Sequence, residues 1–388
     1  MRSIEINQEL LVADLSAMIR CASVNTFGAA MDIGAEAAMA DLYENMLRDL
    51  GLEIGSCEVT VGRRNVWGVL KGSGEGPTIL LAGHMDTVGI DGYDNPFEPI
   101  VKDGRIYGRG SCDMKAGLAA YLEVVRYLQR SGTTLSGDLI IAGVIDEEHA
   151  MAGSRDFGIN GPKVDCAIVA EPSLLQISAA HKGQVLVTMK TKGLAAHSSM
   201  PDKGRNAVYH MAAVVGGLQE YANDLAVRDA DLVCGKPSFN VGAIRGGDNA
   251  CSVPDYCEID IDRRTIPGES TAQVMQELEV VLEQVKRAVP DLICEIGEPY
   301  LDLPPLDTKM DDPVAMAMVE ACTNVLGQVS VSAFPGSTDA PNFGCPAIIC
   351  GPGDLAQCHS LNEYVAIDQI ENAVRIYVHA IQSMQTDQ

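Results

Sequence analysis

The sequence predicts an α/β fold with a mostly parallel sheet, interrupted by an inserted ferredoxin-like α+β domain. Short, wholly apolar strand-like runs alternate with amphipathic helical segments, which indicates an α/β layer. Beyond residue 180 the strand-like segments instead alternate apolar and polar residues, as strands with one solvated face do. We therefore expect a discontinuous main domain over 1–182 and 299–388, and an inserted domain over 183–298.

The first half of the chain supplies the alternating helices and strands. Residues 35–50 place apolar side chains at helical spacing, and Gly51 follows as a C-terminal cap. A second helix is expected over 114–130, with Gly132 beyond it. Apolar runs predict strands at 65–70, 78–82, 138–145 and 166–170.

The segment 183–298 has a different element order: strand, helix, strand, strand, helix, strand. The strands are expected at 184–190, 239–244, 257–262 and 292–296, and the helices at 205–225 and between Ser270 and Pro290. This order is the split βαβ arrangement of a ferredoxin-like unit. The α/β pattern then resumes, with a helix near 313–326, a strand at 347–350 and a final helix near 368–384.

Composition restricts the partners and the compartment. The chain of 388 residues carries 28 lysines and arginines against 53 aspartates and glutamates, and its net charge of -25 argues against nucleic acid or an anionic membrane as partner. No segment resembles a signal peptide or a membrane span. Twelve dispersed cysteines without a C-x-x-C pair are expected to be reduced, mostly buried residues of a cytoplasmic protein.

The stretch LLAGHMDTV, Leu80–Val88, carries the first functional signal. In an extended backbone, residues two apart point to the same face, so His84 and Asp86 could act as a metal ligand and its supporting carboxylate. A histidine at a strand end is more often a structural residue. The interpretation therefore depends on what the remaining chain brings to this point.

Further polar residues fall at or just after the ends of other strands, where open α/β sheets place their active sites. Together with His84 and Asp86 they are Asp113, Glu147, Glu148, Glu171 and His359. The two histidines with three of these carboxylates form a mixed nitrogen and oxygen ligand set that suits zinc, cobalt or manganese, and two metal ions sharing one carboxylate fit it best. Taken singly, each carboxylate could be a helix cap or a solvated charge, and Asp113 could be the N-cap of the helix beginning at Met114.

The adjacent pair Glu147 and Glu148 can divide the work of proton carrier and metal ligand. Metal coordination lowers the pKa of bound water, and a neighbouring carboxylate can remove its proton, a combination that hydrolyses amides. Two competing motifs fail. A dinucleotide loop would need glycine where Asp113 stands, and an inverted zinc motif would need histidine where Ile145 stands.

These blocks also resemble a known family, the metallo-aminoacylases and metallocarboxypeptidases that include acetylornithine deacetylase, succinyl-diaminopimelate desuccinylase and glutamate carboxypeptidase. The resemblance runs nearly end to end through GHMDTV, GRGSCDMKAG, DEEHAMAGS, AEPS and CHS. It implies a zinc-hydrolase catalytic domain in which Asp113 bridges two zinc ions. His84 and Glu171 would hold one ion, Glu148 and His359 the other, with Asp86 behind His84 and Glu147 as general base and acid.

Within the family, AAHKG, AHSSMPDKGRNAV and GPGDLAQCHSLNEY look most like acetylornithine deacetylase. The resemblance implies that the insert is a lid through which the chain forms a homodimer. His197 would polarise the substrate carbonyl, reaching the partner subunit's site, and Arg264 would hold the substrate carboxylate. Many relatives have an asparagine where Cys251 stands, and Asn249, two residues away, is the candidate to replace it in binding the substrate.

The sequence thus predicts a cytoplasmic two-zinc hydrolase, with cobalt or manganese as other possible metals. It would remove a short acyl group, most of all acetyl, from an amino acid such as N-acetylornithine, as in arginine biosynthesis. A desuccinylase and a dipeptide or glutamate carboxypeptidase are the alternatives within the class. A non-catalytic amino-acid-binding protein is the alternative outside it, although such a protein would be expected to have lost a ligand or the base, and none is missing.

Overall fold

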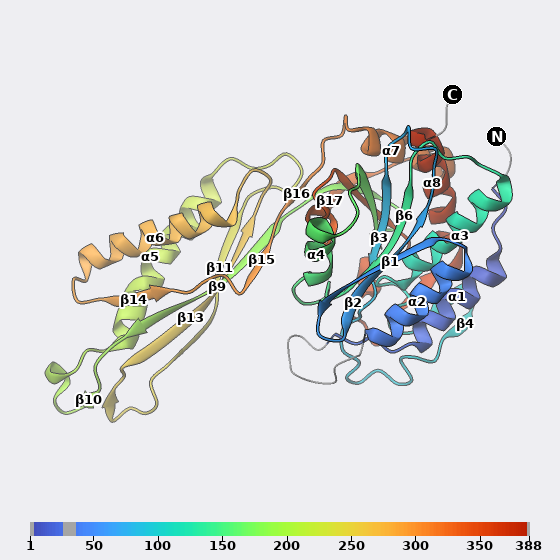
Figure 1. Ribbon diagram of the computed structural model, residues 1–388. Helices are drawn as coiled ribbons and strands as arrows, with labels where there is room; N and C mark the ends of the chain where they lie inside the picture. Colours follow the sequence, from blue (N-terminus) through green and yellow to red (C-terminus); the bar gives the residue numbers. More distant parts are fainter. Residues whose placement is uncertain (1–3, 26–35, 386–388) are drawn as a thin grey trace. The chain divides into compact units, whose positions relative to one another are not determined.

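The computed structural model describes residues 4–25 and 36–385, and they form two compact units (Figure 1). Unit 1 comprises Met1–Ala179, Asp307–Phe334 and Thr338–Gln388, and unit 2 comprises Ala180–Leu306 with Pro335–Ser337. The insert expected over 183–298 falls within unit 2, whose borders lie a few residues outside that range.

The larger sheet has the strand order β1-β2-β6-β3-β7-β18-β8-β16, with β17 paired to β8. Its strands are β1 (Glu53–Thr60), β2 (Arg63–Leu70), β3 (Ile79–His84), β6 (Leu139–Val144), β7 (Cys166–Pro172), β8 (Ile177–His181), β16 (Leu306–Asp307), β17 (Val331–Phe334) and β18 (Ala347–Gly351). The central strands β6, β3, β7 and β18 are parallel neighbours, whereas β1, β2 and β8 pair antiparallel. The predicted α/β fold with a mostly parallel central sheet is confirmed.

Helices cover this sheet because its central strands are apolar on both faces, and every residue of β3 and β6 is buried. The helices of unit 1 are α1 (Gln8–Arg20), α2 (Ala37–Asp49), α3 (Lys115–Ser131), α4 (Ala152–Asn160), α7 (Pro313–Leu326) and α8 (Ile367–Gln385). All except α4 join one core that includes Ile79 and Leu81 of β3. Helix α4 packs instead against β1, β2 and β6, where Phe157 meets Trp67 edge to face.

Most predicted elements of unit 1 are present within a few residues of their expected bounds. The helix predicted over 35–50 begins at Ala37, and residue 35 itself lies outside the described residues. Gly132 ends α3 at φ +68°, the left-handed conformation that glycine adopts without strain. The sequence reasoning missed α1, α4, β1, β8, β16, β17 and a small sheet of β4 (Ile100–Lys102), β5 (Arg105–Tyr107) and β19 (Tyr364–Ala366). Two 3-10 turns, η2 (Ala340–Phe343) and η3 (Leu355–Gln357), complete the unit.

Unit 2 contains an antiparallel sheet with the strand order β11-β13-β9-β14, and β15 also pairs with β9. In chain order its elements are β9 (Gly183–Lys192), β10 (Ala196–His197), η1 (Pro201–Lys203), α5 (Ala207–Val227), β11 (Ser238–Gly246), β12 (Ser252–Val253), β13 (Tyr256–Thr265), α6 (Thr271–Ala288), β14 (Ile293–Ile296) and β15 (Leu301–Leu303). Strands β9, β11, β13 and β14 with helices α5 and α6 form the split βαβ arrangement.

Alternating burial orients this sheet. In β9, Val185, Val187 and Met189 are buried while the residues between them are partly or fully exposed. The buried side chains of β9 and β13 join those of α5 and α6 in one separate core. Ser270 opens α6 with a capping box to Gln273, which satisfies N–H groups of the first turn.

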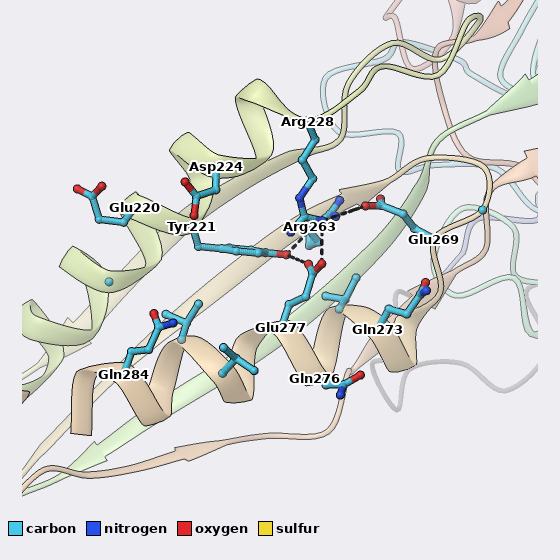
Figure 2. A pocket seen from close by; sticks show the side chains of 15 residues that line it. Glu220, Tyr221, Asp224, Arg228, Arg263, Glu269, Gln273, Gln276, Glu277 and Gln284 are labelled. Atoms are coloured by element: carbon cyan, nitrogen blue, oxygen red, sulfur yellow. Dashed lines mark hydrogen bonds and ion pairs between the residues drawn. The ribbon is translucent and has the colours of Figure 1, made fainter. Parts of the chain in front are cut away.

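A cavity of about 490 Å³ lies on unit 2 and is lined mainly by α5 and α6. Figure 2 shows hydrogen bonds and ion pairs among Arg228, Arg263, Tyr221, Glu269 and Glu277 in its lining. The guanidinium of Arg263, whose side chain is fully buried, donates to the hydroxyl of Tyr221 at 3.1 Å and to Glu269 at 2.7 Å. Arg228 lies 2.7 Å from Glu277, which also accepts a hydrogen bond from Tyr221. This network ties α5, β13 and the start of α6 together.

Replacing Glu269 with glutamine is expected to lower the free energy of unfolding of unit 2 by about 2–4 kcal/mol, because it leaves the buried Arg263 cation without its carboxylate. Glu283 offers a matched control on the same helix, since its ion pair with Lys286 at 2.9 Å is exposed and its loss should cost less than about 0.5 kcal/mol. Urea unfolding followed by circular dichroism measures both. Equal unfolding midpoints for the two variants would contradict the prediction.

Two further features concern the cysteines and the length and apolarity of the helices. The twelve cysteines, all within the described residues, form no disulfide in this structure, and seven of them are buried. Among the described residues, no helix combines the length and apolarity needed to cross a membrane.

Candidate metal centre

Five predicted ligands converge at the ends of the central strands of unit 1. His84 is the last residue of β3, Glu148 follows β6, and Glu171 lies near the end of β7. Asp113 precedes α3, and His359 lies two residues after η3. Because β6, β3 and β7 are parallel neighbours, their carboxyl ends meet at one edge of the sheet, which brings these side chains together.

Asp113 lies between the two imidazoles and offers one carboxylate oxygen to each. Its Oδ1 is 3.1 Å from Nε2 of His84, and its Oδ2 is 3.3 Å from Nε2 of His359. On the His84 side, Glu171 Oε2 lies 3.9 Å from the imidazole nitrogen. On the His359 side, Glu148 Oε2 lies 3.2 Å away. The five residues therefore form two halves that share one carboxylate.

The donor set fits divalent metal ions. Ligand atoms of His84, Asp113 and Glu148 all lie within 4.8 Å of one another. Oε1 of Glu148 and Oε1 of Glu171 are buried and accept no hydrogen bond from the described residues. Such buried, unpartnered carboxylate oxygens are costly unless a cation satisfies them. Nitrogen and oxygen donors of this kind suit zinc, cobalt or manganese.

The electrostatics of the cluster favour a cation at the same place. Burial, together with the negative charge of Asp113, raises the pKa of Glu148 to about 6. Burial also raises the pKa of Glu171 well above its usual range, with Asp113 and Glu148 contributing. Burial opposes ionisation of Asp113, but hydrogen bonds from His359 and His84 outweigh it and hold the pKa of Asp113 below its usual value. Several acidic groups thus surround the two imidazoles.

Asp113 is not a helix cap, although its position before a helix allowed that interpretation. The N-cap of α3 is Met114, and no side chain of the described residues caps this helix end. The Asp113 carboxylate binds both histidines instead. The metal-ligand interpretation therefore fits the geometry better than the capping one.

Asp86 lies beside His84 and contacts it through both its backbone carbonyl and its carboxylate. His84 Nδ1 lies 3.0 Å from the backbone carbonyl oxygen of Asp86, and 3.5 Å from its carboxylate. That carboxylate accepts the backbone N–H groups of Glu147 at 3.2 Å and Glu148 at 3.1 Å. It also accepts a hydrogen bond from Asn25 at 2.8 Å. Asp86 thus fixes both the tautomer of His84 and the loop that carries the acidic pair.

Glu147, the proposed general base, lies largely buried beside the cluster and belongs to neither of its two halves. Its Oε2 lies 4.0 Å from Nε2 of His84. Burial raises the pKa of Glu147 well above its usual range. A carboxylate held in this way is suited to taking and returning a proton.

A buried charge network behind this loop escaped the sequence reasoning. Asp146, at φ +68°, donates its N–H to Glu36 at 3.0 Å, and its carboxylate accepts from Arg63 at 2.8 Å and from Asn25 at 3.2 Å. Arg63 also binds Glu36. Asp339 is a further buried carboxylate, and burial raises its pKa to about 7. Asp146 lies in the DEEHAMAGS block, but its partners Glu36, Arg63 and Asn25 lie in no quoted block, so only the fold brings this network together.

The remaining predicted site residues, His197, Arg264 and Asn249, lie in unit 2. His197 is exposed in β10, and its Nδ1 lies 2.8 Å from the hydroxyl of Ser199. Arg264 is partly exposed and binds Asp262 at 3.1 Å. Its neighbour Arg263 is fully buried in the unit's own network, so Arg264 is the arginine of this pair with surface to offer a substrate.

Asn249 uses its side-chain oxygen locally, because it accepts the backbone N–H of Cys251 at 2.9 Å. The carbonyl of Cys251 in turn accepts the N–H of Ser198 at 3.0 Å, directly after His197. Asn249 therefore shapes the turn beside His197.

Three other histidines, His149, His210 and His379, lie outside the cluster. His149 is exposed and lies 3.9 Å from Asp146, and His210 is largely buried and lies 3.6 Å from Asp291. His379 is partly buried on α8. None of the three joins the cluster of His84, Asp113 and Glu148.

The fold and the ligand set define the chain as a metal-dependent amidohydrolase: two imidazoles and several buried carboxylates gather at the carboxyl ends of parallel strands. The sequence profile of Peptidase family M20/M25/M40 matches residues 80–383, and the chain belongs to this family of hydrolases. The family predicted from the sequence blocks is thereby confirmed.

Curated relatives match the chain over nine-tenths or more of its length. An acetylornithine deacetylase of Vibrio campbellii is 31% identical over 372 residues, which cover 94% of this chain and 96% of that protein. An acetylornithine deacetylase of Erwinia tasmaniensis is 31% identical over 357 residues, which cover 90% and 91%.

Solved structures share the fold. The aminopeptidase PepT of Bacillus cereus superposes with a TM-score of 0.78 at 21% identity, covering 98% of this chain and 99% of that one. The YXEP protein of Bacillus subtilis, described as a dinuclear metal-binding peptidase of the M20 family, gives a TM-score of 0.70 at 18% identity, covering 97% and 99%.

Proposed function

We propose that this chain is a two-metal hydrolase that removes a short N-acyl group, most of all acetyl, from an amino acid such as N-acetylornithine. The observation that carries the two-metal assignment is the place of Asp113, which offers one oxygen toward His84 and the other toward His359. The curated relatives named acetylornithine deacetylase, at 31% identity over nearly the whole chain, support the substrate assignment.

The residues would hold the metals as two half-sites. His84, Glu171 and one oxygen of Asp113 would hold the first ion, and His359, Glu148 and the other oxygen of Asp113 the second. Zinc is the preferred metal, with cobalt or manganese as alternatives. When bound, such ions supply Lewis acidity that acidifies water and polarises the acyl carbonyl.

The protein's own groups would then carry the proton. Glu147, buried at the edge of the cluster, takes a proton from the attacking water and returns it to the nitrogen of the leaving amine as the carbon–nitrogen bond breaks. The products are the carboxylate of the released acyl group and the free amino acid. The carboxylate of Asp86 holds Glu147 in place by accepting the backbone N–H of Glu147.

The roles of unit 2 rest on the family resemblance. Arg264 would hold the substrate's carboxylate with its planar guanidinium, and Asn249 would order the turn next to His197. His197 would polarise the acyl carbonyl and stabilise its oxyanion. We further propose that unit 2 is the lid and dimerisation domain, that His197 serves the partner subunit of a homodimer, and that the enzyme acts in the cytoplasm in arginine biosynthesis.

A substrate panel tests this proposal. The metal-loaded protein is given N-acetyl amino acids, including N-acetylornithine, matched N-succinyl amino acids and dipeptides, and the released amine is measured. We expect the N-acetyl substrates to show a kcat/KM at least about tenfold above the others, because one pocket size favours one acyl group. Release from N-succinyl substrates or from dipeptides alone would replace the proposal with the desuccinylase or carboxypeptidase assignment.

A further inference from the structure

Glu363 is a fully buried glutamate that belongs to neither half of the metal centre. It lies in the segment between His359 and β19, four residues after that histidine. Its carboxylate is surrounded by donors from one short stretch of chain, residues 109–113, the last of which is Asp113.

Both oxygens of Glu363 are occupied in this way. Oε1 accepts the backbone N–H of Cys112 at 2.8 Å and that of Asp113 at 3.1 Å. Oε2 accepts the N–H of Gly110 at 3.1 Å and the Nη1 of Arg109 at 2.7 Å. A carboxylate with four donors, one of them charged, holds them more strongly than a neutral acceptor does.

The backbone around Glu363 joins the same two segments. Gly108 donates its N–H to the carbonyl oxygen of Glu363 at 3.1 Å, and Tyr364 pairs with Tyr107 where β19 meets β5. His359 itself has φ +61°, a left-handed conformation that a non-glycine residue keeps only when its surroundings hold it. Glu363 therefore connects the loop of the shared carboxylate to the loop of the second imidazole.

We propose that Glu363 is a positioning residue that assembles the His359 half of the metal centre. It touches no reacting atom. It fixes the backbone of Asp113 against the segment carrying His359, so that Asp113 Oδ2 and His359 Nε2 stay 3.3 Å apart. This role rests on the proposed two-metal function. Glu363 is neither one of the metal ligands nor the general base.

Glutamine at this position should disturb the loop selectively. Its carboxamide keeps one acceptor oxygen but turns an NH2 group toward N–H donors that need an acceptor, and it removes the negative charge beside Arg109. The His84 half retains His84 and Glu171, which Glu363 does not touch. The second ion should therefore be lost before the first.

The test compares the metal content of purified full-length variants after equilibrium dialysis against buffered free Zn²⁺. We expect the wild type to hold two ions per chain, and Glu363→Gln to hold one under the same conditions, with the second bound about 10- to 100-fold more weakly. Glu123→Gln is the matched control. Glu123 is also fully buried in unit 1 and accepts the N–H of Asn7 at 2.9 Å and a guanidinium N–H of Arg130 at 2.9 Å, but in α3 away from the ligands.

The possible outcomes distinguish a failure of the positioning role from a failure of the proposed two-metal function. If Glu363→Gln binds two ions as tightly as the wild type, or if Glu123→Gln loses the second ion equally, the positioning role is wrong while the two-metal function stands. If the wild type itself fails to bind two ions, the proposed function fails first. Should Glu363→Gln not fold, Glu363→Asp, which keeps the charge on a shorter side chain, is measured against Glu123→Asp by the same criterion, and unweakened binding of the second ion overturns the proposal.

Discussion

Replacing Glu147 with glutamine is expected to lower kcat by about 10³- to 10⁴-fold, the range that a positioned general base contributes. Glutamine has nearly the same shape but cannot accept the proton of the attacking water or return it to the amine. Metal content and KM should stay close to those of the wild type, because Glu147 lies beside the two half-sites rather than within them. Amine release under saturating substrate, with metal content determined on the same samples, measures this effect.

Two further variants serve as controls for the Glu147→Gln result. Glu75→Gln changes an exposed glutamate elsewhere in unit 1 and should leave kcat unchanged. Glu147→Asp keeps the carboxylate but withdraws it from the water, and should fall between the wild type and the glutamine variant. Activity retained within about tenfold in Glu147→Gln would assign the base to another residue.

Replacing Asp113 with asparagine is expected to remove at least one metal ion and to lower kcat by about 10³-fold or more. The amide offers one neutral oxygen in place of two charged ones, so the contact with His84 or with His359 loses its anionic partner. Lewis-acid stabilisation is worth several kcal/mol, and each 1.36 kcal/mol corresponds to about tenfold in rate. Metal analysis and amine release on the same samples measure both effects.

Asp312→Asn is the matched control for Asp113. Asp312 also precedes a helix, but its side chain caps α7 by accepting the N–H of Val314 at 3.0 Å. Asparagine caps a helix about as well as aspartate does, so metal content and kcat should not change. If Asp113→Asn behaves like Asp312→Asn, the shared-carboxylate role of Asp113 is wrong.

The parts of the fold that the sequence predicted are those in which local pattern and environment agree. The run ending in His84 is wholly apolar because β3 is buried on both faces, and Val185, Val187 and Met189 alternate because β9 is buried on one. The candidate ligands were predictable for a related reason. Parallel strands bring their carboxyl ends to one edge, so residues far apart in sequence could be assigned to one place.

The parts that were missed depend on tertiary contacts without a local signature. Helix α4 is short and carries Gly153 and Gly158, and it is held by packing against the sheet rather than by helical periodicity. Glu363 binds backbone N–H groups that are distant in the sequence, and Asn25 binds the distant carboxylate of Asp86. Neither contact leaves a periodic pattern in the sequence. The bond that His84 forms with the backbone carbonyl of Asp86 depends on how the chain turns after β3.

The most direct test of the two-metal account compares one preparation before and after metal removal. The protein is stripped with a chelator, dialysed, and titrated with Zn²⁺ while acetate release from an N-acetyl amino acid and bound metal are followed together. The account predicts no activity above background in the metal-free protein and full activity only when two ions per chain are bound. Hydrolysis by the metal-free protein at the wild-type rate would contradict it.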